Sequence, residues 1–192
     1  MWTFIFHFFR YHALNNFNTQ EKIMNAYLEI NNVKTKIGID LLERIASNLN
    51  DNEDNQLIFQ ELAISAAAAV RGEIAYKDKI NEETARILLN DTDAKVLERI
   101  LRNDVANKIV DMDTLQRIID QSSEDVLKAI ADSIESYESI SADVLATALL
   151  SKNNPSVDYS LASNYSTPKK ILKSLLKNSD PDVIMAAKNS LS

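Results

Sequence analysis

Cysteine is absent from the 192-residue chain, and glycine occurs at only two positions, Gly38 and Gly72. The absence of cysteine excludes disulfides, thiolate catalysis and thiolate-bound metal or iron–sulfur sites. Tight hairpins, phosphate-binding loops and Rossmann turns need glycine where φ is positive, and an average chain carries about 7% glycine. A chain this poor in glycine, with 45% hydrophobic residues, is therefore predicted to be all-α with a substantial core.

Histidine is also scarce, and both copies, His7 and His12, lie in the first twelve residues. Nucleophilic triads and histidine-based metal sites need a histidine within the body of the fold. Dense carboxylates such as Asp91 and Asp93 precede predicted helices, where acidic side chains favour the positive end of the helix dipole. The sequence therefore predicts no catalytic residue, no metal, no cofactor and no enzymatic activity.

Aromatic residues gather in the first twelve positions, MWTFIFHFFRYH. The segment is too short to span a membrane, which takes about 20 apolar residues, and it lacks the basic start and cleavage site of a secretory signal. It is interpreted as a hydrophobic cap on the end of the fold or as an amphipathic surface anchor. A third interpretation is a translation start that is not native, in which case Met24 is the alternative first residue. Without a signal or a span, the sequence predicts a cytoplasmic location.

The formal net charge of −7 is unevenly distributed. Residues 111–143 hold two basic and nine acidic residues, whereas residues 144–192 hold six basic and three acidic ones. An acidic block of this kind is either a solvated helix face or an electrostatic recognition surface. Self-association of the basic C-terminal part with the acidic block stays an alternative.

Internal repeats are the most informative feature of the chain. The repeats begin at Phe59, Ala85, Leu115, Leu145 and Ile171, and the first is the faintest. In each, a valine stands seven residues after the second member of an apolar pair. The valines are Val70, Val96, Val126, Val157 and Val183. The valine and the residue four positions later are predicted to form the inward stripe of the core.

Helix-capping residues recur at matching places in the repeats. The predicted N-caps of the first helices are Asn81, Asp111, Ser141 and Thr167, and those of the second helices are Asp93, Ser123, Asn154 and Asp180. Side chains of these types accept a hydrogen bond from the first turn of a helix. Each repeat is thus predicted to be two short antiparallel helices, which must stack on neighbouring repeats to bury their apolar faces.

The chain upstream of the repeats is predicted to form an N-terminal helical cap. The run N-T-Q-E from residue 18 predicts a helix over residues 19–31, and Asp40 begins another that runs to about Leu49. Residues 1–54 are interpreted as the hydrophobic segment with its capping helices. Residues 55–192 are interpreted as an α-solenoid of about five repeats.

The repeats resemble those of the HEAT-like families, in particular the bacterial leucine-rich repeat variant. The runs N-P-S-V at residues 154–157 and D-P-D-V at residues 180–183 are similar to the D-P-x-V start of the second HEAT helix, and Val70-Arg71 resembles its V-R continuation. The resemblance covers residues 55–192 and implies a solenoid. The iron–sulfur cluster known in the variant family cannot form in this chain, because its cysteine ligands are absent.

The residues two and six positions after the valine are predicted to point away from the core. Stacked repeats would align them as a ridge of mixed charge with one exposed tyrosine, on a face that binds a protein or peptide. The predicted partner-binding residues are Glu98, Arg102, Lys128, Asp132, Tyr159 and Ser163. The alternative interpretation of the four charged residues is two i,i+4 ion pairs, which stabilise any exposed helix by about 0.2–0.5 kcal/mol.

Nucleic-acid binding, as in the HEAT-like DNA glycosylases, is the alternative function. Binding of this kind needs a basic face against phosphate. The residues that resemble a basic strip are Lys169, Lys170, Lys173 and Lys177. They are interpreted as a solvated helix face, because the central repeat is the most acidic part of the chain. The sequence therefore favours a scaffold that binds a protein or peptide along the concave face of a solenoid.

Overall fold

The structure, a computed structural model, describes residues 4–9, 25–30 and 32–192. Within these residues it contains twelve α-helices, one short 3-10 helix (η1, Glu53–Asn55) and three short strands. The helices follow one another from residue 39 to the end of the chain. The predicted helical class is therefore confirmed.

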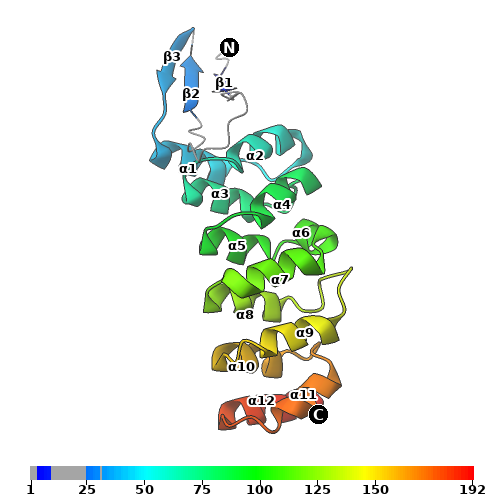
Figure 1. Cartoon of the computed structure of the whole chain (residues 1–192). Helices are drawn as coiled ribbons and strands as arrows, with labels where there is room; N and C mark the ends of the chain where they lie inside the picture. The colour runs from blue at the N-terminus through cyan, green and yellow to red at the C-terminus, as the bar shows by residue number, and fades with distance from the viewer. Residues whose placement is uncertain (1–3, 10–24, 31) are drawn as a thin grey trace.

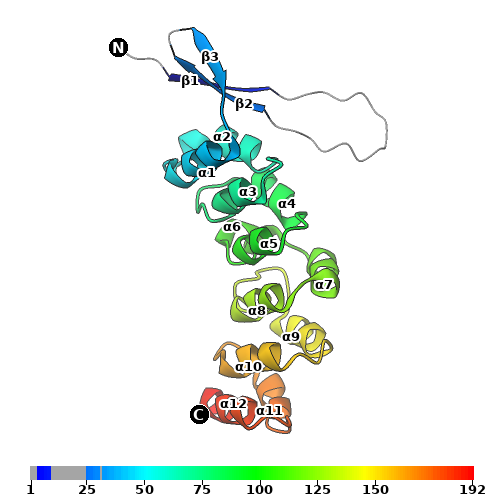
Figure 2. The ribbon, with the colours of Figure 1, turned by 90° about the vertical axis from the view of Figure 1, so that its left-hand side faces the viewer.

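A three-stranded antiparallel sheet precedes the helices (Figure 2). Its strands are β1 (Phe4–Phe9), β2 (Asn25–Ile30) and β3 (Val33–Lys36), with β2 in the centre. The predicted helix over residues 19–31 is therefore wrong at residues 25–30, and residues 19–24 lie outside the described part. Alanine, leucine and isoleucine alternate with polar or amphipathic residues in β2, a period of two that suits a strand. Pairing with both neighbouring strands holds residues 25–30 in the extended conformation.

Six helices lie side by side in one layer, which we name the second-helix layer (Figures 1 and 2). They are α1 (Ile39–Asn48), α3 (Ala68–Ala75), α5 (Ala94–Ile100), α8 (Glu124–Asp132), α10 (Pro155–Ser163) and α12 (Pro181–Leu191). Each of these helices contacts the next in this order. The layer contains the second helix of every predicted repeat, and α1 extends it towards the N-terminal sheet.

The remaining helices form the first-helix layer. They are α2 (Gln56–Leu62), α4 (Glu82–Leu89), α6 (Asp104–Ile109), α7 (Met112–Gln121), α9 (Ala142–Leu150) and α11 (Lys169–Leu175). Figure 2 shows α4, α7, α9 and α11 across from the second-helix layer. The sequence analysis missed α6. This helix has six residues and is capped by Asn103, whose side chain accepts a hydrogen bond from the Val105 N–H, and it interrupts the two-helix pattern.

The repeated valines lie at the centre of the core. All five are fully buried, and so are the residues four positions later, which are Ile74, Ile100, Ile130, Leu161 and Ala187. A residue four positions on lies one turn further along the same face of a helix. Each second helix therefore buries the same stripe, and the predicted inward positions are confirmed.

The predicted helix starts are confirmed at seven of the eight positions. At five of them the side chain accepts a hydrogen bond from the first turn, as Asp93 does from the N–H groups of Lys95 and Val96. Ser123 and Ser141 occupy N-cap positions without such a bond. The eighth position is wrong by one residue, because Pro168 is the N-cap of α11 and Thr167 is buried instead.

A second repeated position joins neighbouring helices of the second-helix layer. The residue seven after the valine donates to main-chain carbonyls at the end of the preceding second helix, and we name this contact the carbonyl clamp. The donors are Lys77 to Ser47 and Leu49, Asn103 to Ala75 and Lys77, Asn164 to Ala131 and Asp132, and Ser190 to Ala162, at 2.7–3.3 Å. After α8, the Tyr137 hydroxyl donates to the Leu101 carbonyl at 3.2 Å instead. Because the last carbonyls of a helix lack partners within it, these bonds fix the spacing of the layer.

The buried stripe predicts a large difference between core and surface substitutions. Ile100→Ala removes a fully buried side chain and is expected to lower the free energy of unfolding by about 2–5 kcal/mol. Val144→Ala, at a position on α9 that is 52% exposed, is expected to change it by less than about 0.5 kcal/mol. Urea titrations of the two variants measure both values, and equal losses would contradict this core.

Candidate partner-binding face

The six predicted partner-binding residues lie on one face of the molecule, the exposed surface of the second-helix layer. The burial of the valine and of the residue four positions later turns the second and sixth residues after it to the opposite side of the helix. Glu98 and Lys128 are half-buried there, and the other four are exposed. The structure therefore brings this set together on adjacent helices, as the spacing predicts.

One ion pair on this face, Arg102 with Asp132, joins the turn after α5 to α8 rather than two turns of one helix. Arg102 Nη2 lies 3.1 Å from Asp132 Oδ2, and both side chains are about half exposed. Arg102, two residues after the end of α5, therefore pairs with Asp132 of α8 and not with Glu98 of α5. Because exposed pairs contribute at most about 1 kcal/mol, this contact orients the two side chains more than it stabilises the fold.

A first groove on this face lies over α3 and α5 and has a volume of about 990 Å³. Glu98 and Arg102 are among its lining residues. Arg99 also lines this groove and donates to Glu73 Oε1 at 2.8 Å. Gly72 leaves room for Arg99, because a Cβ at residue 72 would lie 3.2 Å from Arg99 Nη1. Two of the opposite charges in this groove, Arg99 and Glu73, therefore pair with each other.

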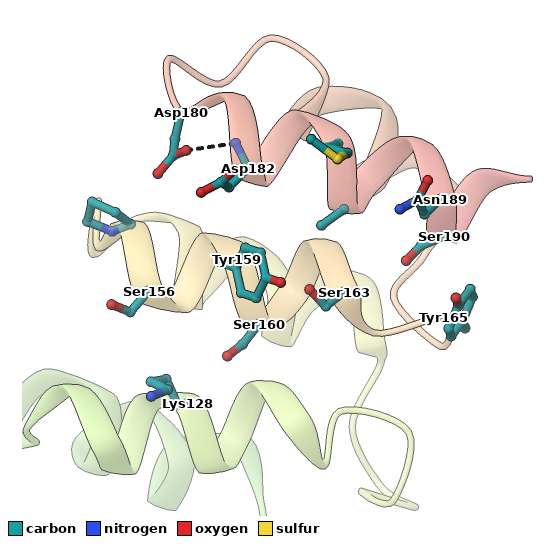
Figure 3. Close-up of a pocket in the computed structure, with 13 residues that line it drawn as sticks. Lys128, Ser156, Tyr159, Ser160, Ser163, Tyr165, Asp180, Asp182, Asn189 and Ser190 are labelled. Atoms are coloured by element: carbon teal, nitrogen blue, oxygen red, sulfur yellow. Dashed lines mark hydrogen bonds between the residues drawn. The ribbon is translucent and has the colours of Figure 1, made fainter.

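A second groove lies between α10 and α12 and has a volume of about 850 Å³ (Figure 3). We name it the α10–α12 groove. Tyr159 stands in its centre, and Tyr165 lies at the end where α10 ends. Met185 of α12 also lines it. These side chains are 49%, 76% and 57% exposed, respectively. Exposed large apolar side chains are ordinary when scattered singly, but a group of them around one groove indicates an interaction site.

Polar groups complete the walls of the α10–α12 groove. Hydroxyl and amide side chains line it on both helices, namely Ser156, Ser160, Ser163, Asn189 and Ser190. Lys128 borders it from α8, and Asp180 and Asp182 stand at the beginning of α12 (Figure 3). The predicted residues Lys128, Tyr159 and Ser163 thus belong to this groove, whereas Glu98 and Arg102 belong to the first one.

The sequence analysis missed Met185 and Tyr165. Met185 follows Val183 by two positions and Asn189 follows it by six, so the spacing applied to α5, α8 and α10 also selects these residues of α12. Tyr165 lies in the turn after α10, outside any helix, and no helical spacing selects it.

Two equivalent contacts join neighbouring repeats beside this face. Arg71 forms a bidentate pair with Asp91, with Nε 2.5 Å from Oδ2 and Nη2 2.9 Å from Oδ1. At the corresponding places near the C-terminus, Asn178 Nδ2 donates to Asp158 Oδ2 at 2.8 Å. The second contact is weaker, because an amide replaces the guanidinium and the buried Asp158 Oδ1 has no hydrogen-bond partner among the described residues.

Burial raises the pKa of the Asp158 carboxyl, and the hydrogen bond from Asn178 offsets part of this effect. The opposite shift occurs at Glu124 on α8, where hydrogen bonds from Ser156 and Asn154 lower the pKa of the carboxyl. The surroundings of the two carboxyls therefore favour opposite charge states. Glu124 is stabilised in its charged form, and Asp158 in its neutral form.

The other predicted features lie away from the α10–α12 groove. The four lysines of the basic strip are exposed on or directly after α11, in the first-helix layer. Within the residues that the structure describes, no three His, Asp or Glu side chains are placed to hold a metal ion. In the same residues, no helix has the length and hydropathy of a membrane span.

No family model, curated protein or solved structure matches the chain. The function must therefore be inferred from the geometry and chemistry of the exposed face.

The raised pKa of Asp158 predicts a pH-dependent effect on stability. The folded chain keeps this proton at pH values where the unfolded chain has already lost it, so the charged carboxylate destabilises the fold above that range. Asp158→Asn is therefore expected to be more stable than the natural chain at pH 7, with a difference that shrinks as the pH falls towards about 4.

Urea titrations at pH 7, 5.5 and 4 measure this difference. Asp143→Asn, at an exposed carboxylate in the first turn of α9, controls for the loss of one negative charge. The burial effect would be refuted if the free energies of unfolding of Asp158→Asn and the natural chain differed by the same amount at all three pH values.

Proposed function

We propose that this protein is a cytoplasmic, non-enzymatic scaffold that binds a protein or peptide on the exposed face of its second-helix layer. The α10–α12 groove is the centre of this contact. One observation carries the proposal, namely the grouping of the exposed side chains of Tyr159, Tyr165 and Met185 around a groove of about 850 Å³. These three side chains are not part of the core, because the buried stripe of α10 and α12 consists of Val157, Leu161, Val183 and Ala187.

The residue types in the groove support peptide binding. Tyrosine dominates the binding energy of many interfaces, and methionine adapts its flexible side chain to varied apolar partners. The surrounding hydroxyl and amide groups both donate and accept hydrogen bonds, as the main chain of a bound peptide requires. Lys128, Glu98, Arg102 and Asp132 supply charges along the same face that orient a longer partner.

The repeats support an α-solenoid architecture of HEAT-like units with this face on the concave side. Five equivalent buried valines, the repeated caps and the carbonyl clamp relate each unit to the next. Stacked units of this kind present extended binding surfaces. The resemblance to the leucine-rich repeat variant agrees with this architecture.

The nucleic-acid alternative has only the lysines of α11 to support it. Their charges lie in the first-helix layer, whereas the groove and its exposed aromatic residues lie in the second. A labelled duplex that binds at low salt and is released at high salt would favour that alternative.

Peptide binding is expected to depend on the α10–α12 groove. Peptides of twelve residues, selected from a random phage-displayed library on the intact chain, are expected to lose about tenfold or more in affinity to Tyr159→Ala and to Met185→Ala. This loss corresponds to at least about 1.4 kcal/mol, because each substitution removes an apolar anchor. Fluorescence polarisation of the labelled peptides measures the affinities.

The matched controls are Leu57→Ala and Val144→Ala, which change exposed apolar side chains of the first-helix layer, 77% and 52% exposed. Both are expected to bind as the natural chain does. Selected peptides that lose affinity to the controls as much as to the groove variants, or a selection that yields no binder, would contradict the proposal.

A further inference from the structure

We infer that the α10–α12 groove takes an extended peptide segment in which a basic residue is followed or preceded, two positions away, by an apolar residue. This inference rests on the proposed function and adds the chemistry of the partner. It follows from the order in which acidic, apolar and amide side chains stand along the groove.

The α12 wall of the groove has three zones in one line. Asp182, Met185 and Asn189 are spaced by three and four residues, so they share one face of the helix. An α-helix rises about 1.5 Å per residue, which places Met185 about 4.5 Å and Asn189 about 10.5 Å along the axis from Asp182. The α12 wall therefore begins with an acidic group, continues with an apolar one and ends with an amide.

An extended peptide suits this order. Alternate side chains of a strand point to the same side and are about 6.6 Å apart. A long basic side chain beside Asp182 thus allows the residue two positions away to lie between Met185 and Tyr159. The hydroxyl and amide groups of Ser160, Ser163 and Asn189 remain for the peptide main chain.

The charge at the beginning of the groove selects a basic side chain over an acidic one. Asp180 accepts the Asp182 N–H at 2.8 Å as the cap of α12 (Figure 3). The exposed carboxylate of Asp182 has no ion pair within the described residues. The two carboxylates exceed the positive half-charge of the helix N-terminus. The basic lining residue, Lys128, lies across α10 on α8 (Figure 3).

The preference can be measured with four fluorescein-labelled pentapeptides. Arg-Ser-Leu-Ser-Asn and its reversed sequence Asn-Ser-Leu-Ser-Arg cover the two directions in which a peptide can lie in the groove. In the other two peptides, glutamate replaces arginine. We expect the natural chain to bind at least one arginine peptide about tenfold more tightly than its glutamate counterpart at low salt. We expect Asp182→Lys to reverse this preference.

Asp143→Lys is the matched control. Asp143 is exposed at the second position of α9, as Asp182 is at the second position of α12, and it belongs to the first-helix layer. Asp143→Lys makes the same change in net charge as Asp182→Lys, and we expect this variant to keep the preference for arginine. Circular dichroism of both variants checks that the helices are retained.

The outcomes separate the inference from the proposed function. Pentapeptides that bind through Met185 without a preference for arginine, or that respond equally to Asp143→Lys, would overturn the inference and leave the proposed function standing. Failure of all four pentapeptides, while selected twelve-residue peptides still bind the groove, would also overturn it. Failure of every peptide would overturn both.

Discussion

The register of the buried valine in each second helix is the constraint on which the rest of the structure depends. When Val157 and Leu161 fill the core, Tyr159 and Ser163 are turned to the opposite side of α10. The same geometry holds in α5, α8 and α12, because the valine and the residue four positions later are buried in each of these helices. A core requirement therefore decides which side chains form the exposed face, and neighbouring repeats place these side chains next to one another.

The carbonyl clamp gives this face its continuity. Asn103 and Asn164 each bond two carbonyls at the end of the preceding second helix, where no partner within that helix exists. The clamp uses lysine, asparagine, serine and, after α8, a tyrosine from a different position, so its geometry is kept while its chemistry varies. Grooves between adjacent second helices therefore have a fixed spacing, and their specificity depends on the side chains that line them.

Features that recur at the same spacing in each repeat could be predicted from the sequence, and features that occur only once could not. The buried stripe, seven helix starts and the shared face of Arg102, Asp132 and Tyr159 follow from local spacing and capping. Strand β2 has an alternating pattern over only six residues and depends on pairing with β1 and β3, which lie elsewhere in the sequence, and α6 is shorter than two helical turns. Tyr165 was missed because it lies in a turn, where its approach to the groove depends on the tertiary structure.

Methyl NMR of the methionines tests the central claim, that a partner binds the face of the second-helix layer. With ¹³C-methyl methionine, Met185 reports from the α10–α12 groove and Met112, half-buried at the start of α7, reports from the other layer. Met185→Leu assigns the first signal. On titration with a selected peptide, the Met185 signal is predicted to shift while that of Met112 stays in place. An unchanged Met185 signal beside a shifting Met112 signal would contradict the account.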